Sequence, residues 1–305
     1  MREPEDLYEL TPAAADVPPG LPLVAGLTGF ADAGGAVQQL AEYFQATVDP
    51  VPIAVFDADE LLDYRARRPI IAFEQDHLTS YTPQRLVLSQ GRDEIGRPFL
   101  LLTGYEPDFQ WERFTLAVLG LVHRFAVSTT TWVHSIPMPV PHTRPIQVTV
   151  GGNRPDLIDA MSVWRPSTRV PSNVLHLVEF RLAELGLPVA EFVLLVPHYL
   201  ADTELPAAAV KTLEVIAAAT GLLFPTDELR EQSRDFVARV DEQVGANEEL
   251  AQLVRTLEQR HDTYMEGNPL RSPLTDDEGE VPSADELAAE LEKFLAIRRQ
   301  ADDEA

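Results

Sequence analysis

The feature of this sequence that most constrains its fold is a regular alternation between dense apolar runs and helical stretches. It begins at Leu21–Phe44, LPLVAGLTGFADAGGAVQQLAEYF, where an apolar run leads through a glycine-rich turn into an amphipathic segment. Such a succession is typical of α/β proteins. Because the apolar runs contain few polar residues, they indicate strands that are buried on both faces. The sequence therefore predicts an α/β fold.

Seven apolar runs are expected to form the strands of one sheet. Between the third and the fourth run, Ser89–Pro98 contains two glycines and predicts a hairpin turn, so these two strands should be antiparallel. The sheet should therefore be mixed. The expected strands are Pro22–Gly29, Val51–Phe56, Gln84–Gln90, Pro98–Tyr105, Ser128–Ser135, Ile146–Gly152 and Glu191–His198.

Three helices are expected in the same core domain, which spans residues 21–224. The first, Phe109–Phe125, is apolar on nearly every side after its first turn, which predicts deep burial. The second begins at Ser172 or Asn173, since either side chain can cap the first turn, and it ends at Gly186. The third is Leu205–Gly221.

The segments outside the core differ in composition. Residues 1–20 are rich in proline and acidic residues and are interpreted as an extended N-terminal arm. Residues 225–265 contain two highly charged helices with narrow apolar seams, which predict a helical hairpin. This hairpin can pack on the core or contact another copy of the chain. The remaining segments are a flexible linker at 266–282 and a C-terminal helix with an acidic tail at 283–305.

The glycine-rich turn raises the question of phosphate binding. A Walker-type loop needs a lysine and a hydroxyl residue after its last glycine, but Gly35 and Ala36 stand there. The interval between Gly26 and Gly29 does not fit the dinucleotide fingerprint either. Asp32 lies at the start of the expected helix, where its carboxylate would repel a phosphate. The turn is therefore interpreted as a tight connection between strand and helix.

Five polar residues in and after the expected strands are the candidate ligand-binding residues. Because ligands of open α/β sheets gather outside the carboxyl ends of the strands, these side chains can share one rim. Arg144 would bind an anion with its planar fork, and Asp32 would orient a histidine or accept a ligand hydroxyl. Alternatively, the histidines only fix hydrogen bonds of loops. The candidates are Asp32, His134, His142, Arg144 and His198.

Other kinds of site find less support. His123 and His176 lie within apolar helices and are interpreted as structural. The histidines lack the tighter spacing or the added acidic residue typical of metal sites, and no cysteine is present, so we expect no metal and no cofactor. No G-x-S-x-G motif occurs, and no catalytic set is recognised.

Composition narrows the classes of partner. The formal net charge of −25 argues against nucleic acid and anionic membrane surfaces, which both require basic patches. No apolar run reaches the roughly 18–20 residues of a membrane span. The first residues, MREPEDLYEL, do not read as a secretion signal. We therefore expect a cytoplasmic protein that binds neither nucleic acid nor membrane.

Four motifs resemble the proteasome assembly chaperone 2 family, in its actinobacterial branch. They are GLTGFADAGG at 26–35, WVHSIPMPVPHTRP at 132–145, FVLLVPHYL at 192–200 and RVDEQVGANEELAQLVRTLEQRHD at 239–262. The histidine–proline motif at 132–145 is the most specific of the four. Together they extend over most of the chain, from about Leu21 to Tyr264.

The resemblance implies a three-layer α/β/α fold with a mixed sheet, similar to the phosphorylase/hydrolase-like fold of nucleoside phosphorylases. It also implies cyclic assemblies of identical chains, here most simply a homotrimer, with a dimer as the alternative. Eukaryotic and archaeal relatives bind proteasome subunits and assist their assembly. Relatives that dock on proteasome rings often end in a hydrophobic–tyrosine–any tripeptide, whereas this sequence ends in RRQADDEA.

Two functions from different classes remain open at this level. The first is a non-enzymatic binding or assembly protein whose partners include proteasome subunits. The second is a protein or enzyme that binds a nucleoside-like or other small ligand in a pocket at the carboxyl ends of the strands.

Overall fold

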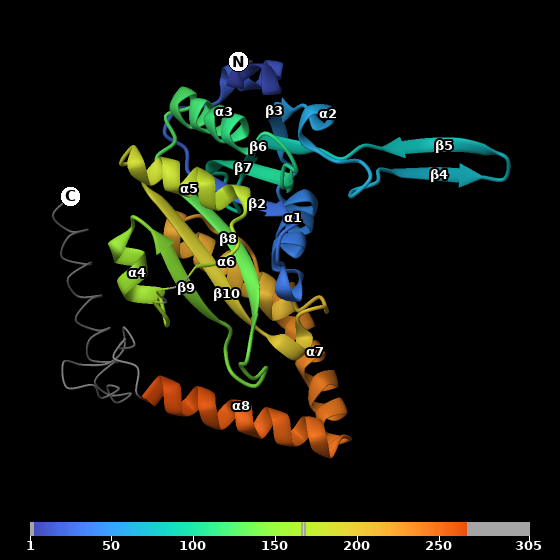
Figure 1. The fold of residues 1–305 in the computed structure, drawn as a ribbon, viewed down its shortest axis with the longest axis vertical. Coiled ribbons are helices and arrows are strands. Elements are labelled where there is room, and N and C mark those ends of the chain that lie inside the picture. Colours follow the sequence, from blue (N-terminus) through green and yellow to red (C-terminus); the bar gives the residue numbers. More distant parts are fainter. Residues whose placement is uncertain (1–2, 166, 168, 267–305) are drawn as a thin grey trace, which may run out of the picture. The chain divides into compact units, whose positions relative to one another are not determined.

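The computed structural model describes residues 3–165, 167 and 169–266 of the chain. Its centre is an eight-stranded sheet with the order β1-β3-β6-β7-β2-β8-β10-β9 (Figure 1). The neighbours β7, β2, β8 and β10 run parallel, and the remaining neighbours run antiparallel. The mixed sheet and all seven predicted strands are thereby confirmed. The strands are β1 (Tyr8–Leu10), β2 (Leu23–Thr28), β3 (Val51–Phe56), β6 (Leu86–Arg92), β7 (Pro98–Tyr105), β8 (Thr130–Met138), β9 (Gln147–Gly152) and β10 (Val189–Pro197).

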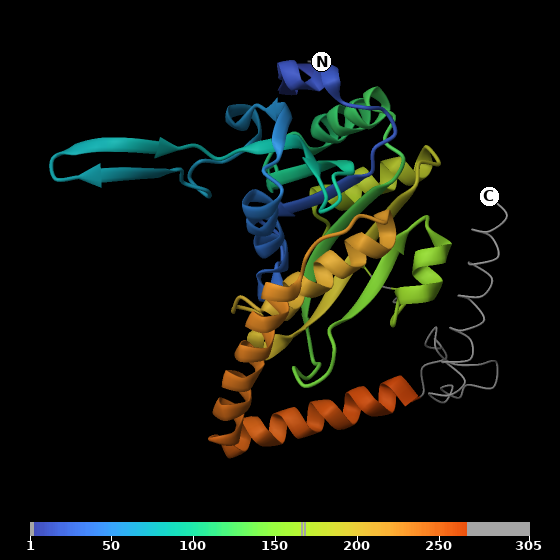
Figure 2. The same cartoon turned by 180° about the vertical axis from the view of Figure 1, so that it is seen from behind.

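Helices cover both faces of this sheet, which confirms the three-layer α/β/α arrangement. One face carries α3 (Trp111–Arg124) and α5 (Val174–Glu184), and the other carries α1 (Ala36–Thr47) and α6 (Pro206–Thr220), as Figures 1 and 2 show. The shorter segments are η1 (Pro4–Leu7), η2 (Pro12–Asp16), η3 (Ala33–Gly35), α2 (Ala58–Leu61), α4 (Pro155–Met161) and η4 (His198–Leu200).

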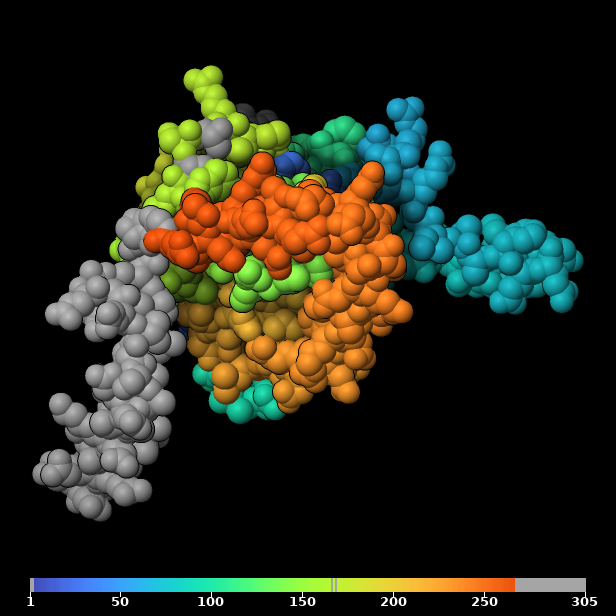
Figure 3. All heavy atoms as spheres, turned by 90° about the horizontal axis from the view of Figure 1, so that it is seen from below, coloured from blue at the N-terminus to red at the C-terminus, as the bar shows by residue number. Residues whose placement is uncertain are grey.

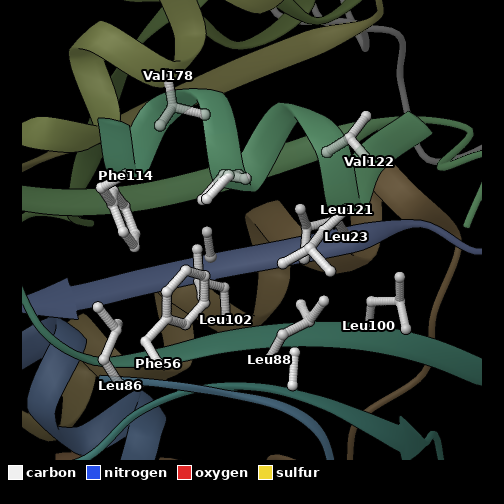
Figure 4. Packing of buried hydrophobic residues seen from close by; sticks show 14 of the residues in the cluster. Leu23, Phe56, Leu86, Leu88, Leu100, Leu102, Phe114, Leu121, Val122 and Val178 are labelled. Atoms are coloured by element: carbon white, nitrogen blue, oxygen red, sulfur yellow. The ribbon is translucent and has the colours of Figure 1, made fainter. Parts of the chain in front are cut away.

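The two hydrophobic cores follow from the alternation of side chains along each strand. Leu100 and Leu102 of β7 belong to the core under α3 and α5, together with Phe114 (Figure 4). Phe99 and Leu101, each one residue out of step, belong to the core under α1 and α6. Because successive strand residues point to opposite faces, a run that is apolar at every position serves both layers.

The N-terminal segment differs from the extended arm predicted for residues 1–20. β1 pairs with β3 at the edge of the sheet, and the side chain of Leu7 is fully buried. An edge strand of three residues is too short to show the alternation of apolar and polar residues that identifies a strand. The prediction of an extended arm therefore rested on the proline and acidic content of residues 1–20 alone.

The helix α3 also differs from its prediction, which was burial on nearly every side. Phe114 and Ala117 face the sheet and are buried, but Leu116 is 52% exposed. Since the sheet lies on one side of this outer layer, the opposite face of α3 is left to solvent.

Two long charged helices follow α6, as predicted. They are α7 (Asp227–Gly245) and α8 (Glu248–Glu266). Leu229 and Phe236 of α7 pack against the core under α1 and α6. Within the described residues, no helix has the length and apolar character needed to cross a membrane.

The chain consists of two compact units, whose boundary in the sequence lies near its C-terminal end. The first unit spans Met1–Thr263 and contains the sheet and its helices. Of the second unit, Tyr264–Ala305, the structure describes the residues up to Glu266, which are helical. The linker predicted at 266–282 falls beyond the described residues from 267 onward, and so does the helix predicted at 283–305.

A second, two-stranded sheet was not predicted. It consists of β4 (Ile70–Glu74) and β5 (His77–Thr82), which pair antiparallel. Figures 1 and 2 show this projecting hairpin, residues 70–82, standing clear of the helices and of the main sheet. The main chain leaves the sheet after β3 and returns to it at β6.

Candidate functional site

A group of polar and aromatic side chains lies between β8, β10 and the N-terminal half of α5, on the face of the sheet that carries α3 and α5. We call it the His134 cluster and define it as Trp132, His134, His176, Glu179 and Glu191. β8 supplies the tryptophan and its neighbouring histidine, α5 supplies the second histidine and one glutamate, and β10 supplies the other glutamate. The pairing of β8 with β10 places Glu191 directly beside Trp132.

One carboxylate oxygen lies at the centre of this cluster. The Nε2 atoms of His134 and His176 are 3.0 and 3.1 Å from Oε1 of Glu191. The side chain of Glu191 is 13% exposed, so both contacts lie in largely buried surroundings. A buried carboxylate requires such donors, because losing water without a substitute costs several kcal/mol.

The tautomer of His176 follows from its backbone contacts. The N–H of Asn173 donates to Nδ1 of His176 at 3.0 Å, so this nitrogen is an acceptor and the proton is on Nε2. The N–H of His176 donates in turn to Oδ1 of Asn173 at 2.9 Å, which completes a capping box. The residue that caps the helix is therefore Asn173. His176 serves both the cap and the cluster, as a donor to Glu191.

The second glutamate is held by the tryptophan. Nε1–H of Trp132 donates to Oε2 of Glu179 at 2.6 Å. The Trp132 ring stacks on the His134 ring with centroids 5.2 Å apart and 12° between the planes. A Cβ on Gly151 would meet Oε2 of Glu191 at 2.5 Å and Oε1 of Glu179 at 3.5 Å. Because two histidines hold the Glu191 carboxylate in place, a β-carbon at position 151 would have to displace it, which favours glycine there.

The two carboxyl groups differ in acidity. Burial, and then the charge of Glu191, raise the pKa of Glu179 to about 7. Burial also opposes ionisation of Glu191, but the hydrogen bonds from His134 and His176 outweigh it and lower the pKa of Glu191 to about 2. The ionised form of the pair therefore has its negative charge on Glu191 first, while burial and that charge favour the protonated form of Glu179.

The cluster also contains a set of atoms that could hold a metal ion. The ligand atoms of His134, His176 and Glu191 lie within 4.8 Å of one another, and two histidines with one glutamate can bind zinc. The tautomer works against this use, because a ligating histidine normally donates from its other ring nitrogen. In His176 that nitrogen accepts the N–H of Asn173. Metal binding would therefore cost the capping box.

Phe30 flanks the cluster, and Arg67 lies beside Gly29, the residue before Phe30. The Phe30 ring lies 6.1 Å from the His134 ring and 6.4 Å from the His176 ring. Arg67 forms a salt bridge with Asp108, and a Cβ on Gly29 would meet its Nη2 atom at 2.7 Å. The chain's own side chains thus occupy the space beside the cluster.

Glu106 ties α5 to the end of β7. Its Oε1 atom accepts the N–H of Val174 at 2.7 Å, at the first turn of α5. Burial raises the pKa of Glu106. The carboxyl group therefore fixes the helix that carries His176.

Of the five residues predicted as a rim, Asp32 lies apart from the His134 cluster. Its carboxylate accepts the N–H groups of Val37 and Gln38 at 2.8 and 3.0 Å, at the N-terminus of α1. It also accepts the hydroxyl of Ser135 at 3.1 Å. Because Ser135 and His134 are neighbours on β8, they point to opposite faces of the sheet. Asp32 occupies the amide groups that a phosphate would need.

His142 and Arg144 lie in the loop after β8, which α7 and α8 cover. In Figure 3 these two helices, in orange, lie against the loop, in green. Nε2 of His142 is 3.1 Å from Oδ1 of Asp241, and its Nδ1 is 2.6 Å from the hydroxyl of Tyr199. Arg144 donates to both carboxylate oxygens of Asp262 at 2.9 and 2.7 Å. Both candidates thus hold the helical hairpin to the loop.

His198 lies in η4, after β10, with its Nδ1 atom 3.3 Å from the carbonyl oxygen of Met138. The five predicted residues therefore lie in separate surroundings: Asp32 at α1, His134 in its cluster, His142 and Arg144 under the helical hairpin, and His198 beside Met138.

Sequence reasoning missed four members of the His134 cluster, namely Trp132, His176, Glu179 and Glu191. A signal was present in the two glutamates, since each interrupts an otherwise apolar run that forms a buried element. A charged residue in such a place is rarely buried without a partner. The partner could not be named from the sequence, because it comes from the pairing of β8 with β10.

Comparison with known proteins gives consistent results. The model of the PAC2 family matches residues 26–244. The chain is similar to a Mycobacterium tuberculosis protein of unknown function, with 40% identity and a TM-score of 0.81 over 88% of this chain and 95% of that one. A Corynebacterium glutamicum protein of unknown function gives 35% identity and a TM-score of 0.82 over 85% and 98%. A Mycobacterium tuberculosis proteasome-assembly chaperone homologue shares the fold, with 22% identity and a TM-score of 0.70 over 77% and 100%. No curated protein matches the chain.

Proposed function

Because this chain belongs to the PAC2 family, we propose that it is a non-enzymatic binding and assembly protein. Its partners in this proposal are proteasome subunits and further copies of the chain itself, most simply in a homotrimer. The structural likeness to a proteasome-assembly chaperone homologue supports this choice of partner.

One observation carries the proposal of a binding protein. The polar side chains of the candidate positions and of the His134 cluster are bonded to other groups of the chain itself. Asp32 holds the start of α1, Arg144 holds α8, and Glu191 holds two histidines. A catalytic group must reach a proton or an atom of its substrate. Side chains bound in this way instead stabilise the fold and leave recognition to the outer surface.

Co-purification tests the choice of proteasome subunits. The tagged full chain is incubated with proteasome α and β subunits at low salt, and the retained proteins are quantified. We expect retention of subunits in a fixed ratio to the chain. A clean negative at low salt would contradict this partner, because low salt preserves weak polar contacts.

A matched variant separates surface binding from use of the His134 cluster. His134→Gln keeps a polar side chain on β8 but removes the imidazole that contacts Glu191. We expect this variant to retain subunits as the wild type does. Loss of retention in a variant of unchanged stability would instead make the cluster the functional site.

A second candidate function is the binding of a small, nucleoside-like ligand. It is favoured by one atom: Nδ1 of His134 is buried and has no hydrogen-bond partner among the described residues. The His134 ring stacks on Trp132 and lies 6.1 Å from the Phe30 ring, so a base would stack on the histidine in the place that Phe30 now takes. A ligand at a hundredfold excess over its Kd would raise the free energy of unfolding by about 2.7 kcal/mol.

Thermal-shift measurements with nucleosides, nucleotides and phosphate test this candidate. A shift that is present in the wild type and absent in His134→Gln would support the ligand site. No shift with any of these compounds would remove its support.

A further inference from the structure

A hollow between α6 and α7 gathers basic side chains, in a chain that is otherwise strongly acidic. Its volume is about 310 Å³, and it lies where the two helices meet the segment before β9 (Figure 2). Three of its lining residues are basic, namely Lys211, Arg230 and Arg234, and one is acidic, Glu214. The whole chain has 49 acidic residues against 24 lysines and arginines. The charge balance of this site, which we call the Arg234 hollow, is therefore opposite to that of the molecule.

The periodicity of the two helices brings these side chains together. Lys211 and Glu214 are three residues apart on α6, so they lie on one face of this helix. Arg230 and Arg234 are four residues apart on α7 and also share a face. Because α6 and α7 pack against each other, the two faces border the same hollow. Basic side chains of two helices thus surround one space.

The glutamate neutralises only part of their charge. Its Oε2 atom lies 3.5 Å from Nζ of Lys211, and its Oε1 atom lies 2.6 Å from Nη2 of Arg230. Within residues 3–165, 167 and 169–266, the guanidinium of Arg234 has no ion pair and no hydrogen bond. Three cations against one carboxylate leave two positive charges without a counter-charge in the hollow.

The basic groups also keep hydrogen-bond donors for a ligand. An ammonium group has three N–H donors and a guanidinium group has five. Lys211 and Arg230 direct donors to Glu214, and Nε of Arg230 donates to the hydroxyl of Thr226 at 3.0 Å. Donors remain on both residues, and all five remain on Arg234. The hollow can therefore surround an anion with N–H groups from two helices.

The lining also has an apolar part. Pro145, Ile146, Ala207 and Val210 supply it, and Val210 is buried. A volume of about 310 Å³ is more than a phosphate group fills, and it lies near the lower limit of pockets for small organic ligands, roughly 300 Å³. The Arg234 hollow thus suits a small molecule with an anionic end and an apolar body.

We propose that the Arg234 hollow binds a small organic phosphate, with the phosphate group among Lys211, Arg230 and Arg234 and the organic part against the apolar residues. A phosphate monoester carries about two negative charges at neutral pH, which match the two unbalanced positive charges. Guanidinium groups bind phosphate oxygens through paired N–H donors. The inference goes beyond the proposed function, because it needs neither a partner protein nor the His134 cluster.

The first test uses phenyl phosphate, which combines the dianion with an apolar ring. Isothermal titration calorimetry with the full chain should give tighter binding for phenyl phosphate than for inorganic phosphate, and no binding for phenol. Inorganic phosphate lacks the part that contacts the apolar residues, and phenol lacks the charge. Equal affinities for the two phosphates would overturn the organic part of the proposal. No binding of either phosphate at millimolar concentration would overturn the site.

The second test changes one cation on each helix. Lys211→Gln and Arg234→Gln should each weaken the binding of phenyl phosphate about tenfold or more, because hydrogen bonds to charged groups are lost. Arg234 is exposed, so its variant should fold. Arg239→Gln is the matched control: it changes the net charge equally on the same helix, but Arg239 does not line the hollow. This control should bind as the wild type does. An equal loss in Arg239→Gln and Arg234→Gln would assign the effect to general electrostatics and overturn the site.

A third variant separates this site from the second candidate function. His134→Gln should bind phenyl phosphate as the wild type does. Loss of binding in His134→Gln, with binding kept in Arg234→Gln, would place the ligand at the His134 cluster and overturn this inference. Retention of proteasome subunits is measured separately, so its failure contradicts the partner in the proposed function and not the Arg234 hollow.

Discussion

The His134 cluster and the projecting hairpin are opposite solutions to the same problem. The cluster places polar side chains inside the molecule, and the hairpin places apolar side chains outside it. Each arrangement is unfavourable in water unless a partner compensates. For the cluster, the chain supplies those partners itself. For the hairpin, the described residues supply none, which points to another molecule.

The difference shows in which region the side chains find all their interaction partners within the same chain. Glu191 receives two donors and Glu179 receives one, so removing a member leaves the others unpaired in a buried place. The hairpin lacks such links, because its apolar residues mainly contact each other across two strands. Changes in the cluster should therefore alter stability, and changes in the hairpin should alter association.

The largest effect is expected for Glu191→Leu. Leucine fills the space but leaves the ring N–H groups of His134 and His176 without an acceptor. Each unpaired buried group costs about 1–3 kcal/mol, so the loss of an acceptor for two groups should lower the free energy of unfolding by about 2–6 kcal/mol. Urea unfolding followed by fluorescence measures this loss.

Glu191→Gln is the matched control, since its amide oxygen can still accept both ring N–H groups. It should lose clearly less than Glu191→Leu. Equal stability of the wild type and Glu191→Leu would contradict the contrast drawn between the cluster and the hairpin. It would show that the histidines of the cluster do not need Glu191 as a hydrogen-bond acceptor.

The second effect is a dependence on pH through Glu179. In the unfolded chain this carboxyl group loses its proton near pH 4.5, but in the folded chain it keeps the proton up to about pH 7. Between these values the folded state binds more protons, so stability falls as pH rises. The difference amounts to roughly 3 kcal/mol at most. Urea unfolding from pH 5 to 8.5 should show this decline.

Glu179→Gln identifies the group responsible. The amide oxygen still accepts the N–H of Trp132, but it does not titrate. The decline above pH 5 should be shallower in this variant than in the wild type. If the free energy of unfolding fell equally steeply with pH in both proteins, the pH dependence would come from other groups. The raised pKa of Glu179 would then be contradicted.

The third prediction concerns the residues that hold the helical hairpin. Arg144→Gln removes both hydrogen bonds to Asp262 and leaves the bond from the Thr143 hydroxyl to Glu258 as the polar link from the loop after β8 to α8. We expect faster hydrogen exchange of α8 amides before Tyr264 and unchanged exchange in α3. Equal protection of α8 in both proteins would show that the ion pair is not needed to hold this helix, and that its buried residues Val254 and Leu257 and the Thr143–Glu258 bond are sufficient.

The sequence predicted the layers of the fold better than the contacts of the site. Dense apolar runs such as Pro98–Tyr105 have one physical meaning, namely burial on both faces, and each became a strand. His142 and Arg144 were placed correctly after a strand. Their partners Asp241 and Asp262 follow about 100 residues later, so no local pattern could show that α7 and α8 cover them.

The projecting hairpin escaped prediction for a local reason. Its turn joins Glu74 to His77 through two residues, and Gln75 takes a φ of +52°. Glycine or asparagine normally occupies such a position, and these residues are the signal that identifies a two-residue hairpin in a sequence. With glutamine and aspartate there, the run IIAFEQDHLTSYT carries no turn signal.

The smallest effect is expected from changing that same turn. Gln75→Gly removes the strain of a left-handed residue with a side chain, which costs roughly 1–2 kcal/mol, but it adds freedom to the unfolded chain. The net gain for the hairpin should be below about 1 kcal/mol. A hairpin ordered in advance loses less entropy on docking, so the proposed oligomer should tighten by at most about fivefold. Dilution followed by light scattering measures this change. If the hairpin takes part in that oligomer, tightening should require the exposed side chain of Phe73 and vanish when Phe73→Thr is added. Tightening that survived this addition would show that the turn acts on association without the hairpin's apolar surface.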